Sequence, residues 1–303
     1  MTATTPFLLI LANTEWPSAV AAPALPHLSA ALARWRRAQR RPQREGDLSL
    51  GHEQVLAQAM GLPPQARGAL AWGAWFARDR GLANGRPCAL ISPCHWDINM
   101  TGVRMDDPAQ LGLSDAHSQA LMAALLPLAQ EDGIALHWLS ATQWLAQGEV
   151  FAGLQAPSPA AIANQELSEH LPQVPGQDPA TRLLRRLQNE AQMLFYSHPV
   201  ADARDAARLP AVNSIWFHGT GQLPERLGPT QAHTFIDLMA LDHHLPTAWE
   251  LADALIAQVL REHPQVDLVM GSPQATQGWT MATLPWWRRW RARKPSVWTE
   301  LLP

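Results

Sequence analysis

Polar side chains that could bind a ligand are concentrated in one stretch of the second half of the chain. Asn189 and Gln192 are three residues apart, so on a helix they would share a polar face. His198-Pro199 should end that helix, because the residue before a proline avoids the α region. Asn213 precedes an aromatic strand that runs into Gly219-Thr220-Gly221, where missing side chains let a ligand approach the backbone. An ordinary helix, loop and strand with a tight turn would give the same pattern.

A second group of reactive side chains is Cys94-His95-Trp96-Asp97, with Cys88 upstream. The spacing matches no zinc motif, because there is no CxxC pair and the chain has only two cysteines. A Cys/His nucleophile pair would need Cys94 to be activated by a neighbouring base, and sequence neighbours on a strand point to opposite faces. A role in lining a ligand pocket or in packing is therefore favoured.

The densest group of metal-ligand residue types is Asp242-His243-His244, which follows Asp237 and His233. No further ligand follows the triplet before Pro246, so a solvated loop that leads into a helix explains it equally well. We recognise no cofactor motif, and we keep Asp242, His243 and His244 as weak candidates for a divalent metal site.

Basic residues are unevenly distributed. Residues 34–44 hold six Arg, from Arg34 to Arg44, and residues 286–294, from Trp286 to Lys294, hold four Arg and one Lys. The rest of the chain carries 12 basic and 26 acidic residues, which disfavours non-specific nucleic-acid binding by the whole molecule. We expect the first segment to be a solvated helix face and the second to be a docked terminal helix. Contact with nucleic acid or with an anionic membrane surface through these segments is the alternative.

The composition is that of a globular protein: 303 residues, 47% hydrophobic and 16% charged, with 14 Trp and one Tyr. It excludes a disordered chain and a coiled coil. No apolar run approaches the ~20 residues of a membrane span. The apolar start resembles a signal peptide, but no Lys or Arg precedes it. Together with the two cysteines, this favours a reduced, cytoplasmic protein.

Hydrophobic periodicity and turn residues predict an α/β protein with a mixed or mostly parallel sheet flanked by helices. We expect a domain division at the Pro/Gln/Gly-rich residues 171–179, giving lobes 1–170 and 180–303, or else one compact domain. Strands are predicted at 7–12, 88–92, 134–139, 212–218, 235–239 and 266–270. Helices are predicted at 26–41, 52–60, 66–78, 114–132, 180–196 and 247–262 and at the C-terminus.

A family resemblance is carried by His198-Pro199-Val200, Arg204, Ala211-Val212-Asn213, Gly219-Thr220-Gly221 and Pro224. This pattern is similar to a stretch of archaeal-type cofactor-independent phosphoglycerate mutases. With Asn189-Glu190-Ala191-Gln192 before it, the pattern resembles more closely the bacterial RpfE-type regulatory proteins, over residues 85–224. The mutases use two divalent metals, held by Asp and His, and a phosphorylated Ser or Thr.

The chain departs from the mutase pattern at three positions. Asn13-Thr14 follows the first strand where a mutase would offer an Asp ligand, Asp202 stands near a family Asn, and His218 replaces an Arg before the glycine turn. We therefore expect a regulatory or ligand-binding protein without a two-metal centre. A metal-dependent phosphoryl-transfer enzyme is the first alternative, and a nucleic-acid-contacting accessory protein is the second.

The predicted binding site takes a small anionic ligand, with a protein partner as a further option. Its residues are Asn189, Glu190, His198, Arg204, Asn213, His218, Gly219 and Gly221, together with His95 and Asp97.

Overall fold

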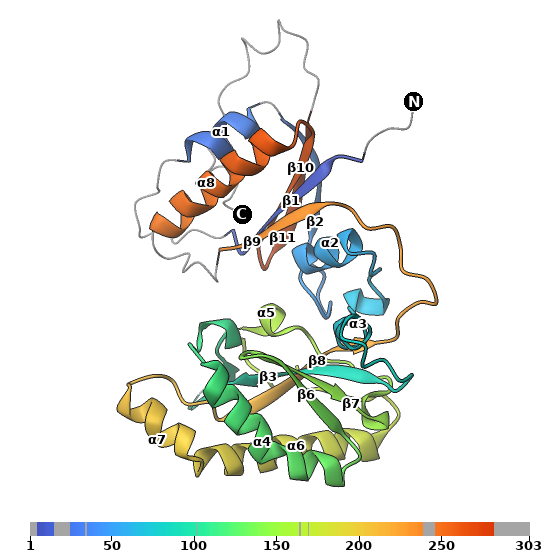
Figure 1. The fold of residues 1–303 in the computed structure, drawn as a ribbon, viewed down its shortest axis with the longest axis vertical. Helices are drawn as coiled ribbons and strands as arrows, with labels where there is room; N and C mark the ends of the chain where they lie inside the picture. The colour runs from blue at the N-terminus through green and yellow to red at the C-terminus, as the bar shows by residue number, and fades with distance from the viewer. Residues whose placement is uncertain are drawn as a thin grey trace, which may run out of the picture. The chain divides into compact units, whose positions relative to one another are not determined.

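The computed structural model describes residues 5–14, 25–33, 35–100, 102–163, 165–168, 170–238 and 246–281. The chain forms two compact units (Figure 1). The first unit is drawn from residues 1–45, 50–61 and 228–303, and the second from residues 46–49 and 62–227. Among the described residues, no helix is both long enough and apolar enough to cross a membrane.

The first unit is built on a mixed five-stranded sheet with the order β2-β11-β10-β1-β9. Its strands are β1 (Phe7–Ala12), β2 (Trp35–Pro42), β9 (His233–Asp237), β10 (Val266–Gly271) and β11 (Ala275–Met281). β1 lies between β9 and β10 and is parallel to both, whereas β11 is antiparallel to β10 and to β2. The buried β1 therefore reads as a continuous apolar run, as expected for a central parallel strand.

Helices cover both faces of this sheet. On one face, α1 (Pro26–Leu32) and α8 (Pro246–Glu262) pack side by side over alternate strand residues such as Leu9 and Leu268 (Figure 1). The carboxylate of Asp253 in α8 accepts hydrogen bonds from the backbone N–H groups of His27 and Leu28, at 3.1 and 2.8 Å, and so caps α1. On the other face, α2 (Gly51–Ala59) packs over Leu8 and Ile10.

The second unit contains an antiparallel four-stranded sheet with the order β6-β7-β3-β8. Its strands are β3 (Cys88–Cys94), β6 (Ala135–Ser140), β7 (Gln143–Gln147) and β8 (Ser214–Gly221). A separate hairpin, β4 (Trp96–Asn99) and β5 (Gly102–Met105), follows β3 directly. Pro93 is accommodated in β3 because the pairing with β7 ends at Ile91, so that side of Pro93 has no neighbouring strand that needs its N–H.

The helices of the second unit also lie on both faces of its sheet. α4 (Asp115–Glu131) and α6 (Asp178–Tyr196) share the larger core with Ile91 and Phe217, and α3 (Trp72–Asp79) packs on Leu90 from the other side. The short helices are α5 (Pro159–Ile162) and α7 (Pro199–Ala206), with 3₁₀ turns at Ala66–Gly68, Pro108–Gln110 and Glu149–Phe151.

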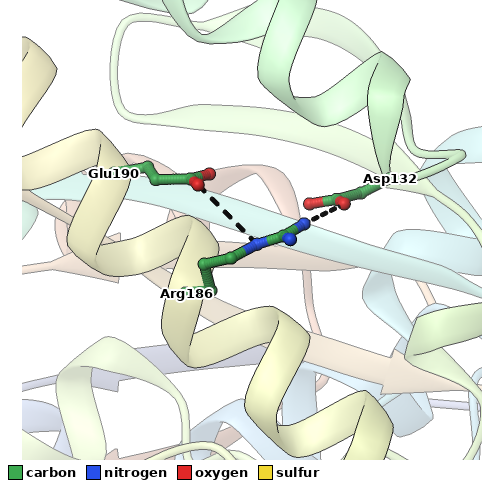
Figure 2. Close-up of polar contacts among 3 residues, drawn as sticks. All are labelled: Asp132, Arg186 and Glu190. Atoms are coloured by element: carbon green, nitrogen blue, oxygen red, sulfur yellow. Dashed lines mark hydrogen bonds and ion pairs between the residues drawn. The ribbon is translucent and has the colours of Figure 1, made fainter.

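An ion-pair group joins the end of α4 to α6 (Figure 2). The guanidinium of Arg186 contacts the carboxylate of Asp132 and lies 3.7 Å from the carboxylate of Glu190, one turn further along α6. Asp132 has a nearly buried side chain, whereas that of Arg186 is more than half exposed. The predicted ligand residue Glu190 is thus part of a contact between two helices.

Most predicted elements are confirmed. The predicted start of the helix at 114 is marked by Ser114, whose hydroxyl accepts a 3.2 Å hydrogen bond from the N–H of His117. The predicted helix 26–41 is wrong in its second half, where residues 35–42 form the strand β2. Arginine favours helices, but pairing with β11 and burial of Trp35 outweigh this local preference. The predicted helix 66–78 begins only at Trp72. Strands β4, β5, β7 and β11 were not predicted.

The two units differ from the two expected lobes. Residues 171–179 lie inside the second unit, so the chain does not divide there. Instead, it passes between the units near residues 45–62 and again near residue 228. The expected terminal helix, Trp286 to Lys294, lies outside the described residues, as do Arg34 and the candidate metal ligands Asp242, His243 and His244.

Candidate functional site

Polar groups gather at the carboxyl ends of the three parallel strands in the first unit. Asn13 and Thr14 follow β1, Asp237 ends β9, and Gly271 ends β10. In open α/β sheets, ligands bind outside this edge of the sheet. In the sequence, Asn13-Thr14 stands out only as a departure from the mutase pattern.

Asn13 holds this edge together. Its backbone has φ of 55°, a left-handed conformation that asparagine tolerates better than most residues. Its side-chain Nδ2 donates a 2.8 Å hydrogen bond to Oδ1 of Asp237. The backbone N–H of Thr14 donates to the carbonyl of Gly271 at 3.0 Å, and its hydroxyl donates to the same carbonyl at 3.2 Å. β1 is thereby tied to both parallel neighbours at their carboxyl ends.

His52, near the start of α2, adds an imidazole on the α2 side of the sheet. The side chain is buried, and burial lowers its pKa from 6.5 to about 4, although the charge of Asp237 acts in the opposite direction. The ring is therefore neutral near pH 7. Within the described part of the chain, Nδ1 of His52 has no hydrogen-bond partner, and the same is true of the buried hydroxyl of Thr276.

Two glycines allow α2 to lie this close to the sheet. A Cβ atom on Gly271 would lie 2.5 Å from Cβ and Nδ1 of His52, and a Cβ atom on Gly51 would lie 2.1 Å from the hydroxyl oxygen of Thr276. Real side chains do not tolerate such distances. The Gly51-His52 pair at a helix start was the sequence signal that could have identified this site.

The site thus combines one carboxylate, a neutral imidazole, an amide and hydroxyl groups. These groups can donate and accept hydrogen bonds to a polar ligand. Among the residues that the structure describes, no three His, Cys, Asp or Glu side chains are grouped as metal ligands.

The binding residues predicted in the second unit do not form a single cluster. β3 and β8 are antiparallel, with Cys94 opposite Ser214 and Cys88 opposite Gly221. Asn213, which precedes β8, therefore lies at the opposite end of this strand pair from Gly219 and Gly221, about 20 Å away at ~3.3 Å per residue.

One end of this strand pair brings together Asn213, His95 and the hairpin that carries Asp97. Asn213 is bound to the backbone of Trp96, and Nδ1 of His95 lies 2.8 Å from the carbonyl oxygen of Ala211. Asp97 is exposed and lies opposite Arg104 in the hairpin. These three residues keep their predicted proximity.

His218 lies in the interior of the sheet. Its Nε2 is 3.0 Å from the hydroxyl oxygen of Ser92, and burial lowers its pKa from 6.5 to about 3. The two cysteines of the Cys88–Asp97 segment are also buried, and burial raises the pKa values of the Cys88 and Cys94 thiols. Both groups are uncharged near pH 7 and have packing roles.

Arg204 and His198 form hydrogen bonds with backbone groups of the second unit. Arg204 lies on α7, and it is buried. Its guanidinium donates to the carbonyl oxygens of Leu111, Pro210 and Gly112 at 2.5, 2.7 and 3.4 Å. His198 caps α7, since its Nδ1 accepts a 3.2 Å hydrogen bond from the N–H of Val200.

On α6, the polar side chains that face the sheet are Gln188 and Gln192, four residues apart. Nε2 of Gln188 donates to the carbonyl of Ile215 at 3.0 Å, and Nε2 of Gln192 donates to the hydroxyl of Ser214 at 3.4 Å. Asn189, which was predicted to share a face with Gln192, is exposed instead. The difference arises because the apolar stripe of α6 turns Gln188 inward.

Comparison with known proteins gives only distant similarities. No family pattern and no curated protein matches the chain. The fold is similar to the PH0037 protein from Pyrococcus horikoshii, with a TM-score of 0.48 and 10% identity, over 91% of this chain and 87% of that one. It is also similar to the cofactor-independent phosphoglycerate mutase from Thermoplasma acidophilum DSM 1728, with a TM-score of 0.39 and 11% identity, over 93% and 91% of the two chains. The resemblance to RpfE-type proteins stays a prediction.

Proposed function

We propose that this chain is a cytoplasmic regulatory or ligand-binding protein, related to phosphoglycerate-mutase-like proteins, that acts without a two-metal catalytic centre. We place its ligand at the carboxyl edge of β1, β9 and β10. The observation that carries the proposal is the hydrogen bond from Asn13 to Asp237.

This hydrogen bond bears on the kind of ligand. A hard divalent cation needs several anionic or carbonyl oxygen ligands, and a two-metal centre needs such a set for each metal. Here the neutral amide of Asn13 turns an N–H donor toward Asp237, so one carboxylate oxygen already has a donor. The neutral His52 adds no charge. This donor set suits a small polar ligand with hydroxyl, carboxylate or phosphate groups better than a metal pair.

The experiment compares binding and turnover on the full chain. Metal-free protein is titrated calorimetrically with 3-phosphoglycerate, and conversion to 2-phosphoglycerate is assayed with Mn²⁺ or Mg²⁺ and then with a chelator. We expect binding without conversion. We also expect Asn13→Ala to weaken binding by about tenfold, the effect of losing one or two hydrogen bonds. Gln265→Ala, an exposed amide change in the same unit, is the control.

Two results would overturn the proposal. Turnover that chelator abolishes would favour the alternative, a metal-dependent phosphoryl-transfer enzyme. Absence of 3-phosphoglycerate binding, or binding that Asn13→Ala leaves intact, would remove the ligand from this edge. The exposed Asp97 and the neighbouring His95, whose hairpin Asn213 holds in place, support a second contact surface in the other unit, for a ligand or a protein partner. His95→Ala tests ligand binding there in the same titration.

A further inference from the structure

A groove lies on the α2 face of the first unit's sheet, away from the carboxyl edge. Its volume is about 390 Å³, within the roughly 300–1,000 Å³ range of small-ligand sites. Val55 and Ala59 of α2 form one wall. The floor is formed by Leu8, Val269, Gly278 and Ala38, from four adjacent strands. Because Gly278 and Ala38 are small, this floor is nearly flat and can accept a planar ring.

Polar groups surround this apolar floor. Gln58 and Thr230 lie along the walls, and Thr280 lies toward β2. These side chains can hydrogen-bond to the edge of a ring or to a sugar. Asp267 also lines the groove.

Arginines of the edge strand β2 are sorted between the two faces of the sheet. Trp35 is buried in the hydrophobic core between the sheet and helices α1 and α8. Arg37 is opposite Trp279, which belongs to the same core, so Arg37 lies on that face of the sheet. Arg36 therefore points to the other face, and it is opposite the groove residue Thr280.

An irregularity in β2 changes the alternation further along the strand. Between Arg37 and Arg40 the register shifts, so that Ala38 and Gln39 together oppose the single residue Gly278. As a result, Arg40 is opposite Gln277 on β11, and Gln277 is in turn opposite Met270 on β10. Met270 belongs to the core under α1 and α8, so Arg40 lies on that face of the sheet. Arg41 is opposite Thr276, which contacts α2. Arg36 and Arg41 thus share the groove face, and Arg37 and Arg40 share the opposite face.

We propose that this groove binds a small anionic ligand with a planar, hydrogen-bonding body, of the chemical class of nucleoside monophosphates. The ring lies on Ala38 and Gly278 beside α2. The phosphate lies at the β2 rim, where Arg36 pairs with it and Arg41 adds positive charge, because guanidinium groups bind phosphate through paired N–H donors. The site is separate from the Asn13 edge and does not depend on the function proposed there.

The test is calorimetric titration of the full chain with adenosine 5′-monophosphate and guanosine 5′-monophosphate, with adenosine and inorganic phosphate as partial ligands. We expect at least one nucleotide to bind more tightly than either part. Arg36→Gln/Arg41→Gln should weaken nucleotide binding by about tenfold or more. Arg37→Gln/Arg40→Gln makes the same change of net charge on the opposite face and should have much less effect.

A second variant keeps the test independent of charge. Ala38 is exposed on the groove floor, so Ala38→Leu should fill the groove and abolish binding while the unfolding temperature is unchanged. The proposal is overturned if neither nucleotide binds at millimolar concentration, if the two arginine double variants weaken binding equally, or if Ala38→Leu leaves binding intact. None of these variants alters Asn13 or Asp237, so failure here is distinct from failure of the proposed function.

Discussion

The side-chain amide of Asn213 forms two hydrogen bonds with the backbone of a single residue, Trp96. Oδ1 accepts from the N–H of Trp96 at 2.7 Å, and Nδ2 donates to its carbonyl at 2.9 Å. The amide thus replaces a strand neighbour at the point where β4 begins. A residue that looked like a ligand contact in the sequence fixes the start of the exposed hairpin.

Replacement of Asn213 should therefore destabilise the second unit. Asn213→Ala removes both hydrogen bonds and is expected to lower the free energy of unfolding by about 1–3 kcal/mol. Asn213→Asp keeps the acceptor but turns a negative charge toward the carbonyl of Trp96. It should therefore lower the free energy of unfolding at least as much as Asn213→Ala does. Urea unfolding measures the change, with the exposed Asn189→Ala as control. Equal stability of Asn213→Ala and the wild type would contradict this role.

Arg204 should be one of the most sensitive positions of the second unit. Its side chain is buried and donates to three backbone carbonyls, and burial lowers its pKa. Arg204→Ala leaves these carbonyls without donors and opens a cavity, for an expected loss of roughly 3–5 kcal/mol. Arg204→Lys cannot reach all three carbonyls and should recover only part of the loss. Thermal unfolding is the measurement, and Arg185→Ala on the exposed face of α6 is the control.

The ion-pair group between α4 and α6 predicts which of two substitutions lowers stability more, and how salt changes the smaller effect. Arg186→Ala should lower the unfolding midpoint more than Glu190→Ala, because it leaves the nearly buried carboxylate of Asp132 without its cation. The effect of Glu190→Ala should shrink as salt is added, since that pair is exposed. Denaturant midpoints at low and high salt test both statements. A larger effect of Glu190→Ala than of Arg186→Ala would be inconsistent with the arrangement in Figure 2.

Acid should destabilise the protein through its buried histidines. The folded pKa values of His52 and His218, about 4 and about 3, lie below the unfolded value of 6.5, so below that pH the unfolded chain binds protons that the folded chain does not. The stability present above pH 6.5 is lost as pH falls. Each histidine should account for about 2 kcal/mol between about pH 7.5 and pH 5.

Denaturant unfolding across this pH range measures that loss. The double variant Ser92→Ala/His218→Phe removes one histidine together with its hydrogen-bond partner, and it should reduce the pH dependence. The exposed His27→Gln is the control for loss of a histidine. An unchanged pH slope in the double variant would show that His218 is not the titrating group.

Local sequence patterns were sufficient for elements that bury a regular stripe or have a defined start. Ser114 followed by Leu121 and Leu125 specified α4, and the apolar run Phe7–Ala12 specified β1. They were insufficient for β2, because its arginines suit a helix and only the distant strand β11 makes the segment extended. They also could not show that Gln188 rather than Asn189 faces the sheet, a difference of one position around α6.

The sequence by itself determined the α/β class, most of the elements and the sorting of basic residues into two short runs, because these depend on periodicity and composition over neighbouring residues. Only the tertiary structure decided which polar groups meet. It joined Asn13 to Asp237 and brought His52 near Asp237. It also separated Asn213 from Gly219, assigned Arg204 to backbone carbonyls and placed Arg36 opposite the groove residue Thr280. These contacts join residues far apart in the chain, and strand order and register, which no local pattern encodes, determine where they form.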